Sequence, residues 1–196
     1  MVKVDNVYQK VLALANKEQR GYITPQEFNL FADQAQLEIF EQYFYDINQF
    51  SRLHGNDTEY SDMLNLLDEK LAVFKQSNTH TLGTGGMNLP PSVYRLGSVF
   101  HNGVEVEMIN INELKIYQSS KLTKDFSFNR VYTLTSGFLQ IYPVPSASIT
   151  VDVTSVRRPL TPYWGYIVVD SKAMYNPAGS VNFDLHPSEE PELVNR

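Results

Sequence analysis

The sequence contains no cysteine, and this absence excludes several kinds of chemistry. Without thiols the chain can form no disulfide, no thiolate metal site and no cysteine nucleophile. This suits a reducing compartment, or a setting in which covalent cross-links are not needed. No apolar run approaches the length of a membrane span, and "MVKVDNVYQK" lacks the apolar core of a secretory signal. We therefore expect no membrane association and a protein that is made and used without export.

The sequence also lacks an excess of positive charge. The net charge is −6, which disfavours a nucleic-acid-binding surface that extends over the whole protein. The chain of 196 residues is long enough for one large or two small domains with a buried core. Its rings are mostly tyrosine and phenylalanine, with a single tryptophan, and a tyrosine-rich balance is common at contact surfaces.

Catalytic and metal-binding patterns are weak. The four histidines form no HExxH motif, and the nearest cluster, His54 with Asp57 and Glu59, lies in a polar turn where carboxylates usually cap helices. The loop "LGTGGM" at 82–87 lacks the Lys-Ser/Thr of a phosphate-binding loop, and no serine lies in a GxSxG motif. We predict no enzyme, no cofactor and no metal. A hydrolase that uses Asp152 or Glu107 is the alternative.

The first third of the chain has the apolar spacing of helices. The first helix contains Val4 to Ala15 and ends before Gly21. The second begins at "TPQEF", where Thr24 and Glu27 form a capping box, and extends to about residue 50, before the turn "HGND" at 54–57. A third helix is predicted over 59–75.

The second helix carries two apolar stripes on roughly opposite faces. One stripe contains Phe28, Phe31, Ala32, Ala35, Ile39 and Tyr43. The other contains Leu30, Leu37, Phe40 and Phe44. A helix that is apolar on both sides is buried on both sides. The second stripe is therefore covered either by another part of the same chain or by a neighbouring subunit.

After the helices the apolar period changes towards two. Asn102-Gly103 and Ser136-Gly137 are hairpin turns, and "SITVDVTSVR" alternates as a strand with one dry face. We predict an α+β fold that forms one compact unit. Its parts are an N-terminal bundle of about three helices (1–78), a linker (79–92), a small antiparallel β unit (93–165), and a C-terminal strand with an extended tail (166–196).

The stretch "RRPLTPYW" at 157–164 ends the last strand of that β unit. Its two prolines have no backbone N–H to donate to a sheet, and they bias the preceding residues towards extended conformations. One interpretation is that the strand simply ends here and Trp164 covers the edge of the core. The other is an extended arm that binds a partner, because arginine, tyrosine and tryptophan are preferred interface anchors.

Several segments, in this order, resemble structural proteins of tailed bacteriophages, including crAss-like phages. They are "GYITPQEFNLFADQAQLEIFEQYF", "LPPSVYRLGSV", "NGVEVE", "NELKIYQSSKLTK", "IYPVPSASITVDV", "RRPLTPYWGY" and "FDLHPSEEPELV". Together they resemble the head-to-tail connector, or ring adaptor, family.

The resemblance implies a ring of copies of this chain, commonly twelve, in the virion at the head-to-tail junction, made in the host cytoplasm. It implies contacts with the portal protein and with other ring or tail proteins, and a lumen through which DNA passes without specific binding. It implies no catalysis. The predicted contact residues are Leu30, Leu37, Phe40, Phe44, Arg157, Arg158, Tyr163 and Trp164.

A virion surface or glycan-binding module is the alternative to a ring protein. Aromatic rings stack on sugar faces, and Tyr132, Tyr142, Tyr163 and Trp164 are the candidate residues. Core packing explains the same rings more simply.

Overall fold

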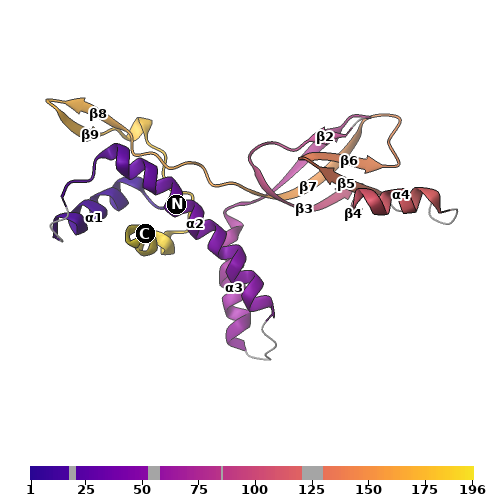
Figure 1. Cartoon of the computed structure of the whole chain (residues 1–196), viewed down its shortest axis with the longest axis horizontal. Coiled ribbons are helices and arrows are strands. Elements are labelled where there is room, and N and C mark those ends of the chain that lie inside the picture. Colours follow the sequence, from indigo (N-terminus) through magenta and orange to yellow (C-terminus); the bar gives the residue numbers. More distant parts are fainter. Residues whose placement is uncertain (18–20, 53–57, 85, 121–129) are drawn as a thin grey trace. The chain divides into compact units, whose positions relative to one another are not determined.

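The computed structural model describes residues 1–17, 21–52, 58–84, 86–120 and 130–196. The chain divides into two compact units (Figure 1). Unit 1 contains residues 1–74 and 159–196, and unit 2 contains residues 75–158. Unit 1 is therefore built from both ends of the chain, and unit 2 is inserted between them.

Three helices form the N-terminal part of unit 1: α1 (Val4–Lys17), α2 (Pro25–Arg52) and α3 (Thr58–Ala72). They confirm the three helices predicted from the sequence. The predicted capping box is also present, because the Thr24 N–H donates to the Glu27 carboxylate at 2.9 Å and the Glu27 N–H donates to the Thr24 hydroxyl at 3.3 Å. The Thr24 hydroxyl also donates to the Glu27 carboxylate, at 2.7 Å, and the two hydrogen bonds that this carboxylate accepts from the Thr24 N–H and hydroxyl lower its pKa.

The C-terminal part of unit 1 is a series of short elements. They are β8 (Tyr166–Val169), β9 (Lys172–Tyr175), the 3-10 turns η1 (Pro177–Gly179) and η2 (Pro187–Glu189), and α5 (Glu190–Asn195). β8 and β9 form a two-stranded antiparallel hairpin that extends away from the helices of unit 1 (Figure 1).

This C-terminal segment completes the core of unit 1, so the prediction of an extended tail is wrong. Phe183, Leu185 and Leu193 are buried. The Phe183 N–H donates to the Val2 carbonyl at 3.1 Å, which ties the segment to the N-terminus. Alternating apolar residues with prolines look extended in the sequence, but here Phe183, Leu185 and Leu193 are part of the core of unit 1.

In the part of unit 2 that the structure describes, there are one seven-stranded sheet and one helix. The strands lie in the order β1-β7-β3-β4-β5-β6-β2. Their bounds are β1 (Lys75–Leu82), β2 (Met87–Asn88), β3 (Val93–His101), β4 (Val104–Met108), β5 (Val131–Thr135), β6 (Phe138–Tyr142) and β7 (Ile149–Arg157), and the helix is α4 (Ile111–Ser119).

The prediction of a helical bundle with a small antiparallel β unit is therefore wrong in three respects. The sheet is large and mixed, since β4 and β5 pair in parallel, and α4 lies in the connection that such a pair requires. β1 and β2 lie largely within residues 79–92, which were predicted as a linker. The sheet also ends at Arg157, and residues 159–165 belong to unit 1.

The two edge strands of this sheet are joined by a very short connection. β1 and β2 are at opposite ends of the strand order, yet only residues 83–86 separate them, and Gly83 and Gly86 form a β-bridge. A flat sheet of seven strands would place its edges far apart, at about 4.8 Å per strand step. The sheet must therefore curl until its edges approach each other.

Both predicted hairpin turns are confirmed. Asn102 and Gly103 have φ values of 52° and 77°, and Ser136 and Gly137 have 53° and 78°, as a type I′ turn requires. The predicted strand at 148–157 is β7, and its buried face includes Val153. The core inside the curled sheet consists of Leu82, Val99, Val106, Tyr132, Leu139, Ile141, Val151 and Val153.

Candidate functional site

The segment 157–164 is where the chain passes from unit 2 back to unit 1. Arg157 ends β7, and Pro159 is the first residue of the returning part of unit 1. At the end of unit 2 the Arg158 N–H donates to the Ser92 carbonyl at 2.8 Å, and its side chain is exposed. The prolines have a structural reason here, because a strand has to stop where the chain leaves its sheet.

Side-chain amides on α2 hold the returning segment. The Trp164 N–H donates to the Asn29 amide oxygen at 2.7 Å, and the Asn29 amide nitrogen donates to the Trp164 carbonyl at 3.2 Å. About two turns further along α2, the side-chain amide of the buried Gln36 makes two hydrogen bonds. Its nitrogen donates to the Leu160 carbonyl at 2.8 Å, and its oxygen accepts from the Asp184 N–H at 2.9 Å. These bonds satisfy backbone groups that no sheet pairs.

Trp164 anchors the β8–β9 hairpin to the helices. The indole is only 3% exposed, and its Nε1–H donates to the Asp5 carboxylate at 2.9 Å. Its ring lies 4.5 Å from Tyr8 on α1 and stacks on Tyr166 and Tyr175 at 6.0 and 5.6 Å between centroids. Of the two interpretations of "RRPLTPYW", the buried one therefore describes Trp164, which offers no surface to a partner in this conformation. Its neighbour Tyr163 is 45% exposed.

The second stripe of α2 divides into a covered and an uncovered part. Phe40 is fully buried, with its ring 4.9 Å from Phe74 and 5.2 Å from the half-buried Phe44. Leu37 is also half-buried. Leu30, near the start of the helix, is 71% exposed. The chain itself covers Phe40, so only the N-terminal part of the stripe offers an open apolar surface.

Two of the exposed apolar surfaces of unit 1 lie on α2 and on the β8–β9 hairpin, and α3 also exposes Met63 and Leu66. On α2, Leu30 and Phe31 are adjacent and 71% and 61% exposed. We call them the α2 patch. The second surface is the β8–β9 hairpin, whose exposed apolar residues are Ile167, Val168, Val169 and Met174. The sequence analysis predicted a strand here but missed its exposure, although three consecutive apolar residues in a two-stranded hairpin cannot all face one body.

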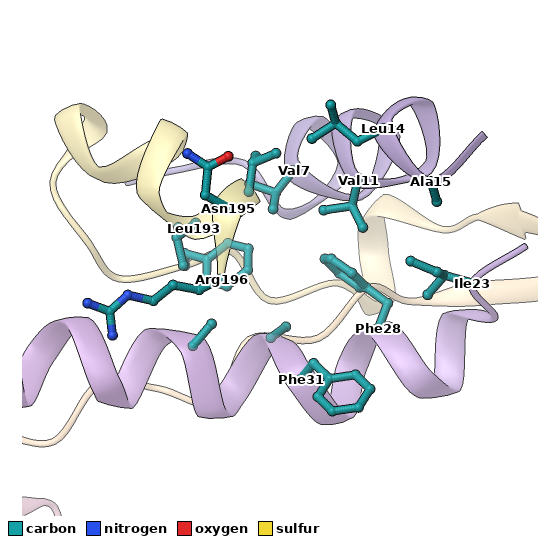
Figure 2. Close-up of a pocket in the computed structure, with 14 residues that line it drawn as sticks. Val7, Val11, Leu14, Ala15, Ile23, Phe28, Phe31, Leu193, Asn195 and Arg196 are labelled. Carbon is teal, nitrogen blue, oxygen red and sulfur yellow. The ribbon is translucent and has the colours of Figure 1, made fainter. Parts of the chain in front are cut away.

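An apolar groove runs between α1, α2 and α5 (Figure 2). Its volume is about 420 Å³. The residues that line it are Val7, Val11, Leu14, Ala15, Ile23, Phe28, Phe31, Ala32, Ala35, Phe183, Leu193, Val194, Asn195 and Arg196. Phe31 belongs both to the groove and to the α2 patch. The groove was not predicted, because it depends on where the C-terminal segment returns.

A buried polar cluster joins α2, α3 and η2. The Lys70 ammonium pairs with the carboxylate of Glu189, and the Glu189 side chain is 5% exposed. The same ammonium lies 5.7 Å from the centre of the Tyr43 ring. Burial, and next the charge of Glu189, raise the pKa of the Tyr43 hydroxyl. This cluster connects elements of unit 1, and no substrate-sized cavity of the described residues includes it. We interpret it as structural.

Two buried tyrosines of unit 1, Tyr8 and Tyr43, predict sensitivity to alkali. Burial raises the pKa of Tyr8 and of Tyr43, whereas in the unfolded chain a tyrosine titrates near 10. Above that pH the unfolded state releases protons that the folded state keeps. The free energy of unfolding should therefore fall with rising pH by up to about 1.4 kcal/mol per pH unit for each tyrosine.

Urea denaturation between pH 9 and 11, followed by circular dichroism at 222 nm, measures this slope. In Tyr43→Phe the slope should be shallower than in the wild type. Equal slopes in the two proteins would contradict the assignment to Tyr43.

The residues of the two alternative functions do not converge. Asp152 and Glu107 are exposed on different strands, β7 and β4, and Asp152 accepts a hydrogen bond from the Thr79 hydroxyl at 2.6 Å. Of the candidate glycan-binding rings, Tyr132 is buried in the core of unit 2 and Trp164 in that of unit 1. Within the described residues, no three His, Cys, Asp or Glu side chains gather as a metal site would require.

Comparisons with protein-family models and with curated proteins find no match to this chain. Across the ranges that the structure describes, none of the helices combines the length and the apolar character needed to cross a membrane.

Proposed function

We propose that this chain is a structural protein of a tailed bacteriophage that assembles with copies of itself into a ring. The ring would lie at the head-to-tail junction, contact the portal protein and other ring or tail proteins, and let DNA pass through its lumen. The ordered resemblance to ring adaptors motivates the phage assignment. The ring part rests on an observation about the fold, namely that unit 1 leaves the α2 patch uncovered.

The α2 patch supports self-association because its side chains are large, adjacent and uncovered. A single exposed leucine is ordinary, but Leu30 and Phe31 are continuous with an apolar groove and lie on the same unit as an exposed apolar hairpin. Surfaces of this kind mark protein interfaces. The proposal includes no catalytic step, and the functional residues are contact residues.

Replacing Leu30 with glutamate tests the proposal. Because glutamate is a good helix former and position 30 is 71% exposed, the monomer should keep its fold and its unfolding midpoint. Its assembly, measured by sedimentation velocity alone and with the portal protein, should be weakened by tenfold or more, which corresponds to about 1.4 kcal/mol per interface. The exposed Gln49 on the same helix provides the control Gln49→Glu, which should assemble like the wild type.

Two outcomes would contradict the proposal. A wild-type protein that stays monomeric at high concentration and ignores the portal would remove the ring function. Unaltered assembly of the Leu30→Glu variant would show that the α2 patch is not the contact. Electron microscopy of the intact phage neck would then decide whether the chain is present there at all.

A further inference from the structure

The β8–β9 hairpin has an outer face that nothing in its own chain covers. Ile167 is paired with Met174, and Val169 with Lys172, so these four side chains lie on one face of the hairpin. Ile167, Val169 and Met174 are 52%, 43% and 55% exposed. A two-stranded hairpin is marginal in water by itself, and exposed apolar side chains do not stabilise it. This face therefore gains from a second apolar surface.

The apolar groove of unit 1, in turn, has space between its walls that no side chain of the described residues fills. Its 420 Å³ would hold about fourteen waters at the volume of liquid water, against walls in which Asn195 and Arg196 are the polar residues and the others are aliphatic or aromatic. Figure 2 shows Val11 and Ala15 on α1 facing Phe28 on α2 across this space. A groove of this kind is stabilised when apolar side chains replace the water.

The two surfaces agree in length. The part of α1 that lines the groove, from Val7 to Ala15, rises about 12 Å. From Tyr166 to Val169, β8 extends about 10 Å. The strand can therefore lie along the groove with its outer face inwards.

The charges of the two surfaces are compatible. The only charged residue among those that line the groove is Arg196, and its guanidinium already pairs with Glu192 at 2.7 Å and with Glu38 at 3.3 Å. Of the charged residues of the hairpin, Asp170 lies in its turn. Lys172 lies on the same face as Ile167 but beside the turn, where its long side chain can extend the ammonium into water. Insertion would therefore bury no unpaired charge. Burial of an unpaired charge is the cost that usually prevents such a contact.

From these observations we infer that the hairpin of one copy docks in the groove of the next copy, an inference that rests on the proposed self-assembly. A hairpin cannot fill its own groove here, because Trp164 fixes its base to Asp5 and Asn29 and its outer face is exposed in the folded chain. The donor and acceptor surfaces differ, so the contact is head-to-tail. Contacts of this type close into a ring when the rotation between copies permits.

The interface extends beyond the hairpin. A stable interface usually buries about 800 Å² on each partner, more than three aliphatic side chains supply. Phe31 lines the groove and also belongs to the α2 patch, so a docked hairpin would lie beside Leu30. Each copy in a ring makes the contact twice, once as donor and once as acceptor.

The absence of cysteine provides a clean test. Two single-cysteine proteins are prepared, Ile167→Cys in the hairpin and Ala15→Cys in the groove, and mixed at micromolar concentration with a short bismaleimide cross-linker. Docking would bring the two thiols to millimolar effective concentration, so cross-linking between residues 167 and 15 should be up to about a thousandfold faster than by free collision. Mass spectrometry of the linked peptides identifies the product, which can only join two copies.

Ala13→Cys is the matched control for the groove position. Residue 13 is exposed and lies about 200° around α1 from residue 15, so it faces away from the groove. It should react with Ile167→Cys only at the collision rate. Equal cross-linking from positions 13 and 15 would overturn the inference.

The remaining outcomes separate the docking contact from the proposed function. No link between 167 and 15, in a protein that still forms rings, overturns the docking contact and leaves the ring standing. A link in a protein that neither forms rings nor binds the portal supports the contact and removes the neck function. No link and no assembly removes both.

Discussion

Replacing Trp164 with alanine is expected to lower the free energy of unfolding of unit 1 by about 3–5 kcal/mol, the usual cost of removing a large buried aromatic side chain. The indole is 3% exposed and contacts Tyr8 on α1 and both strands of the hairpin at its base, through Tyr166 and Tyr175. Its removal also leaves the Asp5 carboxylate without the Nε1–H donor. The loss should appear in urea denaturation followed by circular dichroism at 222 nm.

The adjacent residue gives the control for this prediction. Tyr163 is 45% exposed, so Tyr163→Ala should change the same free energy by about 0.5 kcal/mol or less. If Trp164→Ala cost no more than Tyr163→Ala, the tryptophan would not be the anchor that the structure indicates. Because Trp164 is the only tryptophan, its fluorescence in the wild type reports on this anchor alone.

Replacing Lys70 with methionine is expected to destabilise unit 1 by about 3 kcal/mol, because it leaves a buried carboxylate without its cation. The Glu189 side chain is 5% exposed, whereas that of Lys70 is 19% exposed. The two single variants should therefore differ. Glu189→Gln should cost less than Lys70→Met, since the ammonium can still reach water and the carboxylate cannot.

The double variant Lys70→Met with Glu189→Met completes a thermodynamic cycle. Removing both charges relieves the desolvation cost, so the double variant should be more stable than Lys70→Met alone. Additive losses, measured by the same urea titration, would show that the two groups do not interact. A Lys70→Met variant whose free energy of unfolding equals that of the wild type would show that Glu189 finds another partner.

Local signals in the sequence predicted local structure well. The capping box of Thr24 and Glu27 and the turns Asn102-Gly103 and Ser136-Gly137 each act through bonds or φ values within a few residues, so no distant contact was needed. β1 gives no such signal. Its sequence "KQSNTHTL" has one buried side chain, Leu82, and the strand is held by eight pairs with β7. Backbone pairing of that kind leaves no hydrophobic pattern to find.

The contact residues show the same division between local and distant information. The helical period correctly indicated that α2 has apolar residues on two sides. It could not show which of them the chain covers, because Phe40 is buried by Phe74, whereas Leu30 is left open. The sequence analysis left both covers open, and the structure shows that the chain itself covers Phe40 and leaves Leu30 exposed. Phe44 packs on Phe40, so a change there would disturb the core, and Leu30 is the better probe.

The position at which unit 2 joins unit 1 has an evolutionary consequence. The chain enters the sheet at Lys75 and leaves it after Arg157, and Lys75 is the direct antiparallel neighbour of Val156. Such neighbours lie about 5 Å apart, so the two points at which the chain enters and leaves the sheet lie side by side. Recombination that exchanges the residues between Lys75 and Arg157 would keep the junction geometry, so the sheet can diversify in lineages that conserve unit 1.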